Sequence, residues 1–495
     1  MALHLSKSRY CGAVQCPKML WLRQNRPEAF DESVMNQGVL ETGTRVGDLA
    51  RGLFGDYAQV PYDADLGAML RETERLMDAG VPVICEASFA TGELFCSVDI
   101  LKNLGARRVE LYEVKSSTSV SDIYYDDVAF QVCVLRRLGY TVERACLVHL
   151  NSSYVRHGEL DLHRLFTTED LTEHVMKMQS FTEGYIDQLR AYMEQTEEPF
   201  QPLGEQCSKP YACGFFPYCT RDLPHPNVFD VSRLQTKKKL ELLQEGIVSF
   251  EDLRACRKLN RNQRQQVEHE LSDCPDSVDR DAIRGFLHRL SFPLYFLDFE
   301  TINPAIPPFD ETHPYQQLPF QYSLHWLDRP DGPLHHAEFL ARPGHDFRRE
   351  LAEHLCRDIP WGVCTTAYNM GFEKRCIQDL ASLFPDLHDH LMDICDNVQD
   401  LMIPFQNRYW YNRDMQGSYS IKYVLPALCP GDPELDYHNL EDVHKGDEAS
   451  AAFQRMPSLS PEEQESLRRS LQAYCRLDTL AMVKIWEKLI AAARE

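Results

Sequence analysis

Apolar residues along this chain form short runs of the length of β-strands, separated by polar turns and by segments with helical patterning. In the first half, residues 95–101 (FCSVDIL) and 111–115 (LYEVK) read as strands, and the segment that carries Gln131 reads as a helix. In the second half, residues 294–301 (LYFLDFET) read as a buried strand. Further strand-like stretches follow it and alternate with helical segments. We therefore expect an α/β fold in both halves.

A helical region is predicted between these halves. The segment 221–229 (RDLPHPNVF) contains two prolines and is expected to be a linker. Over residues 233–270 we expect short helices, because leucines recur at helical spacing and the pattern breaks at Gly246. This region is also the most basic one, so its side chains could follow a phosphate backbone. A solvated helical face between domains is the alternative. The basic residues are Lys237, Lys238, Lys239, Arg254, Arg257, Lys258, Arg261 and Arg264.

Composition sets the frame for these elements. A chain of 495 residues predicts two or three domains, and 43% hydrophobic and 26% charged residues are typical of globular proteins. The net charge of −23 is unusual for a nucleic-acid binder, although a local basic groove can coexist with an acidic exterior. Seventeen cysteines without an export signal predict a reducing compartment. Because no apolar run reaches 18 residues, we expect a cytoplasmic protein without a membrane partner.

A first chemical site is predicted on the two strands of the N-terminal half. Residues two apart on a strand face the same side, so Glu113 and Lys115 would project together beside Asp99. Two carboxylates can hold a Mg²⁺-type ion through their oxygens. The ion would activate water, and the lysine ammonium would add hydrogen-bond donors near an attacked phosphorus. A solvated strand with alternating charges is the alternative for the E-V-K triplet by itself.

The order of Asp99, Glu113-x-Lys115 and a helical Gln131 resembles the RecB-type nucleases of the PD-(D/E)XK class. In that family the last motif is Q-x-x-x-Y, and here Leu135 stands in the tyrosine position. Those enzymes also carry an acidic residue or a histidine on the first helix. The nearest candidate for it in this chain is Glu41.

An iron–sulfur site is a second candidate. Cys207, Cys213 and Cys219 are six residues apart in a loop rich in Pro, Gly and aromatic residues, which suits a cluster held by thiolates. The sequence resembles the RecB-like nucleases that carry a [4Fe–4S] cluster, with one cysteine before the nuclease core and three after it. That resemblance implies Cys16 as the fourth ligand, with Cys11 as its rival. A Cys₄ zinc site or unrelated buried cysteines are the alternatives.

The C-terminal half contains a third candidate site. Asp298-x-Glu300 ends a strand, Asn369-x-x-Phe-Glu373 follows another strand, and Tyr474-x-x-x-Asp478 lies on a helix near the C-terminus. This order resembles the DEDD exonucleases, which have an RNase H-like fold.

The resemblance implies a role for each of these residues. Asp298, Glu300 and Asp478 would ligate metal ions, and Tyr474 would orient the attacking water. The third acid would be Glu373 where the family usually has aspartate, and Asn369 would position its helix. Rivals for the third acid are Asp396 and Asp400, and a decayed version of the fold is the alternative. The S-x-K of residues 417–428 is similar to a helix on the substrate side of such enzymes. His313, His335 and His336 are interpreted as loop or surface histidines.

Taken whole, the chain resembles an uncharacterised bacterial family that joins an iron–sulfur RecB-like nuclease to a DEDD-type exonuclease. The resemblance implies a nuclease domain over 1–222, a basic helical linker over 223–290 and an RNase H-like domain over 291–495. It implies Mg²⁺ or Mn²⁺ at both sites, a 4Fe–4S cluster, and DNA, single-stranded or at its ends, as the partner. Cleavage at the C-terminal site would run 3′ to 5′, in DNA repair, processing or defence. An RNA exonuclease, or a nucleic-acid-binding scaffold with one or both sites silent, are the alternatives.

Overall fold

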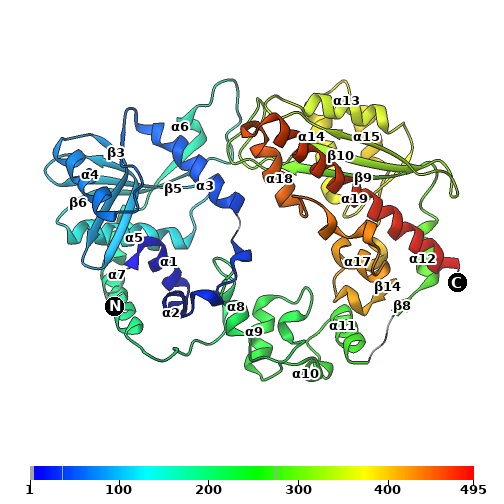
Figure 1. Ribbon diagram of the computed structural model, residues 1–495, viewed down its shortest axis with the longest axis horizontal. Coiled ribbons are helices and arrows are strands. Elements are labelled where there is room, and N and C mark those ends of the chain that lie inside the picture. Colours follow the sequence, from blue (N-terminus) through cyan, green and yellow to red (C-terminus); the bar gives the residue numbers. More distant parts are fainter. Residues whose placement is uncertain (1–4, 36, 273, 275, 495) are drawn as a thin grey trace. The chain divides into compact units, whose positions relative to one another are not determined.

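The computed structural model describes residues 5–35, 37–272, 274 and 276–494. The chain divides into two compact units (Figure 1). Unit 1 comprises Met1–Asp222 and Pro304–Gln316, and unit 2 comprises Leu223–Asn303 and Gln317–Glu495. Residues 304–316 thus belong to unit 1, whereas the sequence placed them in the C-terminal domain.

Unit 1 is built around one mixed sheet. The sheet has the order β2-β3-β4-β5-β6-β7, and β1 pairs with β4. β3, β4 and β5 form an antiparallel meander, and β6 lies parallel to β5 after a helical crossover. Its strands are β1 (Leu5–Ser6), β2 (Ala58–Gln59), β3 (Val83–Thr91), β4 (Leu94–Asn103), β5 (Arg108–Lys115), β6 (Thr141–Leu150) and β7 (Phe166–Asp170). Its helices are α1 (Lys7–Gln15), α2 (Pro17–Asn25), α3 (Gln37–Ala50), α4 (Leu66–Asp78), α5 (Asp122–Arg137), α6 (Leu162–Leu165), α7 (Thr172–Met193) and α8 (Phe216–Cys219). The two predicted strands and the predicted helix are confirmed by β4, β5 and α5.

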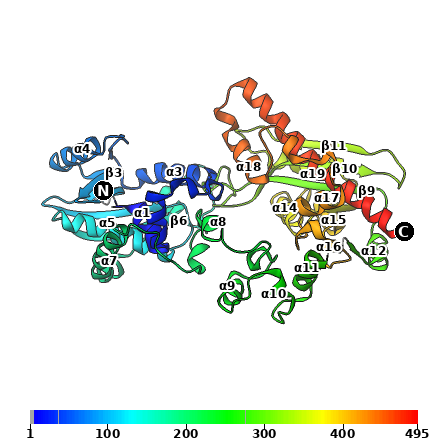
Figure 2. The same ribbon diagram turned by 60° about the horizontal axis from the view of Figure 1, so that its bottom comes forward.

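Packed side chains cover both faces of this sheet. Successive residues of a strand point to opposite sides, so they enter different cores. Leu111 packs in a core with residues of α1, α4, α5 and α7. Its neighbour Tyr112 packs in a second core with residues of α3 and with Ala305. α5 and α7 run side by side on the first face (Figures 1 and 2).

The stretch 304–316 is held in unit 1 by hydrogen bonds as well as by packing. Arg156 Nη1 donates to the carbonyl oxygens of Pro307 at 3.0 Å and Pro308 at 2.9 Å. Tyr315 donates its hydroxyl to the carbonyl oxygen of Ser116 at 2.6 Å. These contacts explain why the stretch leaves the unit of its flanking strands. They also fix the backbone directly after β5.

Unit 2 contains a five-stranded sheet of order β11-β10-β9-β12-β13 and a two-stranded ribbon of β14 and β8. β9, β10 and β11 are antiparallel, whereas β12 and β13 run parallel to β9. Its strands are β8 (Asp276–Val278), β9 (Leu294–Ile302), β10 (Leu318–Leu327), β11 (His335–Leu340), β12 (Cys364–Ala367), β13 (Val398–Asp400) and β14 (Trp410–Asn412). Its helices are α9 (Thr236–Gln244), α10 (Phe250–Arg254), α11 (Arg261–Ser272), α12 (Arg280–Leu287), α13 (Arg348–Asp358), α14 (Gly371–Leu383), α15 (His388–Asp396), α16 (Ile403–Gln406), α17 (Ile421–Leu428), α18 (Gly446–Arg455) and α19 (Pro461–Arg494).

The alternation along β9 decides which side chains face α19. Phe296 packs against Trp486 of α19, with ring centroids 6.0 Å apart. Phe299 points to the other side and packs against Tyr322, whose hydroxyl donates to Asp358 of α13. Even-numbered residues of β9 therefore face α19, which crosses β9 and β10 (Figure 1).

Both units combine helices with a mixed sheet, so the predicted α/β class is confirmed. The short helices predicted over 233–270 are confirmed by α9, α10 and α11, and the chain turns at Gly246 with φ of 76°. Within the described ranges, no helix is both long and apolar enough to cross a membrane.

Candidate functional site

In unit 1, β4 and β5 bring the predicted acidic residues together. Asp99 on β4 accepts a hydrogen bond through Oδ2 from the backbone N–H of Val114, at 2.7 Å. Glu113 and Lys115 project to the same side of β5, and Lys115 Nζ donates to Glu113 Oε1 at 2.6 Å. The side chains that the sequence grouped into one site are neighbours in the structure.

Helix α5 adds two polar side chains to this group. Gln131 Nε2 donates to Glu113 Oε2 at 2.7 Å. Asp127, one turn earlier, accepts hydrogen bonds from Lys115 at 2.6 Å and from Gln131 at 3.0 Å. Sequence analysis missed Asp127, although its spacing of four from Gln131 places both on one helical face. Leu135, one turn later, is buried in the core.

Lys7 of α1 completes the network. Its ammonium donates to Glu113 Oε1 at 2.7 Å and lies 3.5 Å from Asp127 Oδ1. Sequence analysis missed Lys7 and named Glu41 as the nearest residue for the first-helix position. Glu41 is exposed on α3, so Lys7 is the residue that an N-terminal helix supplies to this site.

The two carboxylates of this site differ in their affinity for protons. Burial, together with the charge of Glu113, raises the pKa of Asp99 to about 7. Burial would also raise the pKa of Glu113, but Lys115 and Lys7 outweigh it and hold that pKa below its usual range. Gln131 Oε1 is buried without a hydrogen-bond partner among the described residues. A cation could therefore replace the proton on Asp99 while Glu113 stays ionised.

The four predicted cysteine ligands line one small cavity of unit 1. Cys16 lies between α1 and α2, and Cys207, Cys213 and Cys219 come from the loop around α8. Burial raises the pKa of Cys213 to about 11, and the three other sulfurs add to this effect. Within the described part of the chain, no three of the four sulfur atoms all lie within 4.8 Å of one another.

Contacts next to these cysteines hold the loop on the helix end. Gln15, beside Cys16, donates through Nε2 to the carbonyl oxygens of Gln206 at 2.7 Å and Tyr211 at 2.8 Å. Cys11, the rival ligand, does not line the cavity. Its thiol is instead close enough to the Asp127 carboxylate to be affected by that charge.

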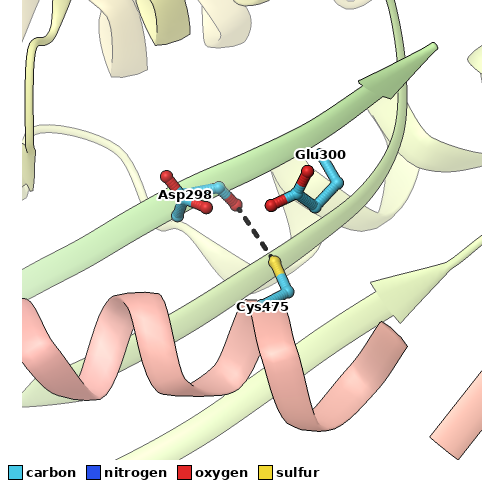
Figure 3. A group of neighbouring side chains, drawn as sticks. All are labelled: Asp298, Glu300 and Cys475. Atoms are coloured by element: carbon cyan, nitrogen blue, oxygen red, sulfur yellow. Dashed lines mark hydrogen bonds between the residues drawn. The ribbon is translucent and has the colours of Figure 1, made fainter. Parts of the chain in front are cut away.

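In unit 2, β9 and α19 bring a second acidic group together. Asp298 and Glu300 project from β9 toward α19, as Figure 3 shows, and Asp478 comes from α19. All three line one cavity of about 180 Å³. The thiol of Cys475 lies with Asp298 and Glu300, and potential ligand atoms of these three residues are all within 4.8 Å of one another. Cys475 also donates to the carbonyl oxygen of Asp298 at 3.9 Å, which ties α19 to β9.

Two tyrosines lie at Asp478. Tyr474, one helical turn before it on α19, lines the same cavity, as the sequence predicted from their shared face. Tyr437 donates a hydrogen bond to Asp478 Oδ1 from a short 3₁₀ turn. Sequence analysis missed Tyr437 because it lies 41 residues from its partner.

The three candidates for the third acid occupy different surroundings. Glu373 is buried on α14, its Oε2 has no hydrogen-bond partner among the described residues, and its charge acts on Asp298. Asp400 Oδ1 accepts the backbone N–H groups of Asn369 at 3.0 Å and Met402 at 2.9 Å. Asp396 is exposed at the end of α15. Of the three, Glu373 is the acid with a buried oxygen that no described residue hydrogen-bonds, but it does not line the cavity of Asp298, Glu300 and Asp478.

Electrostatic repulsion within this second group is strong. Burial raises the pKa of Asp298 well above its usual range, and Asp478 and Glu300 raise it further. The pKa of Glu300 is raised by burial and by Asp478. Burial raises the pKa of Asp478 to about 6, although Tyr437 and Lys422 oppose the shift. Like charges in one buried site cannot all ionise without a compensating cation, so the donor set fits a divalent metal.

A family model matches residues 295–420 and describes them as a domain of unknown function (DUF2779). This range begins on β9 and includes Asp298, Glu300 and Glu373, but it ends before Asp478. Neither the curated proteins nor the solved structures contain a match to the chain.

Proposed function

We propose that this chain is a metal-dependent nuclease with one active site in each unit, acting at the ends of DNA. The observation that carries the proposal is the gathering of Asp298, Glu300 and Asp478 around one cavity, with raised pKa values for all three. Metal-dependent hydrolysis of a phosphodiester uses carboxylates placed in this way, because they would hold the cations that offset phosphate charge.

We assign unit 1 to the PD-(D/E)XK class. An antiparallel meander, a crossover helix and a parallel strand support this assignment, with Asp99 on the second long strand and Glu113 and Lys115 on the third. In this assignment Asp99 and Glu113 would hold a Mg²⁺ or Mn²⁺ ion. The Lys115 ammonium would donate to the attacked phosphate, Asp127 would hold that ammonium, and Gln131 would hold the carboxylates of Glu113 and Asp127.

We assign unit 2 to the RNase H-like DEDD exonucleases. Three antiparallel strands followed by two parallel ones, with acids on β9, α14 and α19, support this assignment. Asp298, Glu300, Glu373 and Asp478 would hold the ions. Tyr474 orients the attacking water through its hydroxyl, and Tyr437 holds Asp478 in place. The direction of cleavage in this assignment is 3′ to 5′.

Bound divalent ions would supply Lewis-acid chemistry, which activates water and offsets the negative charge on the reacting phosphate. The chain's own residues would provide the hydrogen-bond donors to the phosphate, orient the attacking water and hold the protons of the site. Lys422 of α17 lines the cavity of unit 2, where its ammonium can contact a phosphate oxygen.

We also propose that Cys16, Cys207, Cys213 and Cys219 hold a [4Fe–4S] cluster, which would fasten the ends of unit 1 together. The cavity that all four cysteines line supports it. A zinc ion held by the same four thiolates is the alternative.

The test is digestion of end-labelled single-stranded DNA, duplex DNA and RNA with Mg²⁺ or Mn²⁺. Asp298→Ala should abolish one activity, Lys115→Ala the other, and the double variant should show neither. Loss of one electrostatic stabiliser reduces such rates by about a hundredfold or more. If RNA were digested in preference to DNA, the substrate would be RNA and the proposal of a DNA nuclease would be wrong. Binding without cleavage by the wild-type chain would support the scaffold alternative instead.

A further inference from the structure

A second cavity of unit 2, outside the carboxylate site, has the chemistry of an anion site. Its volume is about 150 Å³. Arg233, Arg408 and Tyr419 line it together with the side chains of serine, asparagine and glutamine residues. Among the described residues that line it, there is no aspartate or glutamate.

Arg408 is the central side chain of this cavity. Its Nη2 donates to the carbonyl oxygen of Gly417 at 2.7 Å, and its guanidinium lies 4.1 Å from the centroid of the Tyr411 ring. Nε and Nη1 are buried, and neither has a hydrogen-bond partner in the described part of the chain. A buried cation without a counter-ion is costly, and Arg408 lines this cavity, so an anion bound in the cavity would stabilise its charge.

Arg233 supplies a second positive charge at the same cavity. Its guanidinium stacks on the ring of Tyr419, 3.9 Å from the centroid. Neither Arg233 nor Arg408 forms an ion pair with a carboxylate of the described ranges. Both residues have positive φ, 53° and 59°, which is a sparsely populated backbone conformation for a residue other than glycine.

The first turn of α11 forms another wall of the cavity. Asn260 and Gln263 cap this helix reciprocally, each side chain accepting the backbone N–H of the other at 3.0 and 2.9 Å. A helix begins with the positive end of its dipole, which favours an anion at this place.

The walls are held together by Gln266. Its Oε1 accepts the backbone N–H of Ser232 at 2.9 Å, and its Nε2 donates to the carbonyl oxygens of Asp230 at 3.0 Å and Gln416 at 3.1 Å. A Cβ atom at Gly417, where φ is +73°, would lie 2.3 Å from Gln266 Oε1. A larger residue at position 417 would therefore displace the Gln266 side chain that holds the walls of the cavity together.

One short segment separates this cavity from the carboxylate site. Tyr419 lines the anion cavity, and its carbonyl oxygen accepts a hydrogen bond at 2.9 Å from Tyr368, which lines the carboxylate cavity. Ile421 and Lys422, which lie two and three residues after Tyr419, also line the carboxylate cavity. A larger pocket of about 910 Å³ shares Arg233 with the anion cavity, and both acidic and basic side chains line it.

We propose that Arg408 and Arg233 bind a backbone phosphate of the nucleic-acid strand whose end lies at Asp298, Glu300 and Asp478. The proposal rests on the proposed function, because it names the part of the substrate that this unit holds next to its carboxylates. Two guanidinium groups without carboxylate partners match the charge and the hydrogen-bonding of a phosphodiester.

The first experiment measures binding in the full-length chain with both nuclease sites silenced by Lys115→Ala and Asp298→Ala. Arg408→Gln should weaken the binding of a fluorescent single-stranded oligonucleotide about tenfold and reduce the slope of log K against log salt by about 0.7. Arg233→Gln, at an exposed position, should act in the same direction without affecting folding. Arg329→Gln, which removes an equal charge outside both cavities, is the control and should bind as the parent does.

The second experiment locates the phosphate. Oligonucleotides with one neutral methylphosphonate at successive positions should lose affinity at one position near the end, and Arg408→Gln should remove that loss. Equal binding by the Arg408, Arg233 and Arg329 variants, or an equal methylphosphonate loss with and without Arg408, would overturn the proposal. Inorganic phosphate that binds at Arg408 as tightly as the oligonucleotide would also overturn it in favour of a free anion. These experiments measure binding and not cleavage. A wild-type chain without nuclease activity would therefore contradict the proposed function, but the role of Arg408 in binding could still be tested.

Discussion

The ammonium of Lys7 lies 2.7 Å from Oε1 of Glu113, a contact between residues 106 positions apart in the chain. Lys115 donates to the same oxygen. The carboxylate of Glu113 is 1% exposed, and two cations hold it ionised there. The N-terminal helix is therefore part of the acidic site of unit 1, and it contributes charge as well as packing.

Replacing Lys7 by Met should raise the pKa of Glu113 and lower the free energy of unfolding by about 1.5 kcal/mol, since Glu113 loses one charged hydrogen-bond donor and keeps Lys115. The loss should be largest above pH 5, because a carboxylate with a depressed folded pKa stabilises the fold above its unfolded value of about 4.3. Urea unfolding at several pH values measures both effects.

Lys177→Met is the matched control for this change. Lys177 pairs with Glu173 on the surface of α7, and such pairs contribute well under 1 kcal/mol. Equal destabilisation by the two variants would show that Lys7 has no special role in the network.

Local patterns were enough to predict the strands and the acids that lie on them. Asp99 and Glu113 were grouped correctly because both lie on strands joined by a short turn, and alternation fixes the direction of each side chain. Asp298 and Glu300 were grouped because they lie two residues apart on one strand, β9, and therefore face the same side. The helical spacing of Tyr474 and Asp478 placed both at one cavity.

Contacts between distant segments left no comparable pattern. Lys7 and Tyr437 reach their acids from a helix and from a turn whose positions depend on the packed fold. The choice among Glu373, Asp396 and Asp400 needed burial and hydrogen bonding, which spacing does not give. The place of residues 304–316 depended on backbone acceptors for Arg156.

Anaerobically purified protein should contain about four iron and four sulfide per chain and absorb near 400 nm. Cys213→Ser should remove most of the iron, because Cys213 is a buried member of the four-cysteine cavity. Metal analysis and absorbance spectra measure the loss. Cys429→Ser, a partly buried cysteine of unit 2, should retain the full iron content. One zinc and no iron in the anaerobic wild-type protein would contradict the cluster.

Tyr437→Phe should reduce the exonuclease activity of unit 2, because Asp478 loses the hydroxyl that holds it. We expect a decrease of about tenfold, compared with complete loss for Asp298→Ala. Tyr474→Phe should also reduce kcat without abolishing it. The rates are measured in a chain that carries Lys115→Ala, with substrate labelled at its 5′ end. Tyr322→Phe, which removes a hydroxyl bound to Asp358 on the other side of the sheet, should leave the rate unchanged. An equal rate for wild type and Tyr437→Phe would show that the Tyr437 hydroxyl has no role in the exonuclease site.

Metal binding in unit 2 should strengthen as the pH rises from 6 to 8. Burial raises the pKa of Asp478 to about 6 and that of Glu373 to about 8, so protons occupy the site at the lower end of this range. A cation must displace them, and each proton released makes the affinity about tenfold higher per pH unit. Calorimetry with Mn²⁺ in buffers of different ionisation enthalpy counts these protons, in a chain that carries Asp99→Ala.

The stability of the metal-free protein should change in the opposite direction. Carboxyl groups whose folded pKa is raised stabilise the fold at low pH and lose that contribution as the pH rises through 6 to 8. Added Mn²⁺ should restore it, and Asp478→Asn should weaken both the proton release and the restoration. Asp396→Asn is the control, because Asp396 is an exposed acid of the same unit. If Mn²⁺ affinity were independent of pH, or if the two variants behaved alike, the carboxylates of β9 and α19 would not form the metal site.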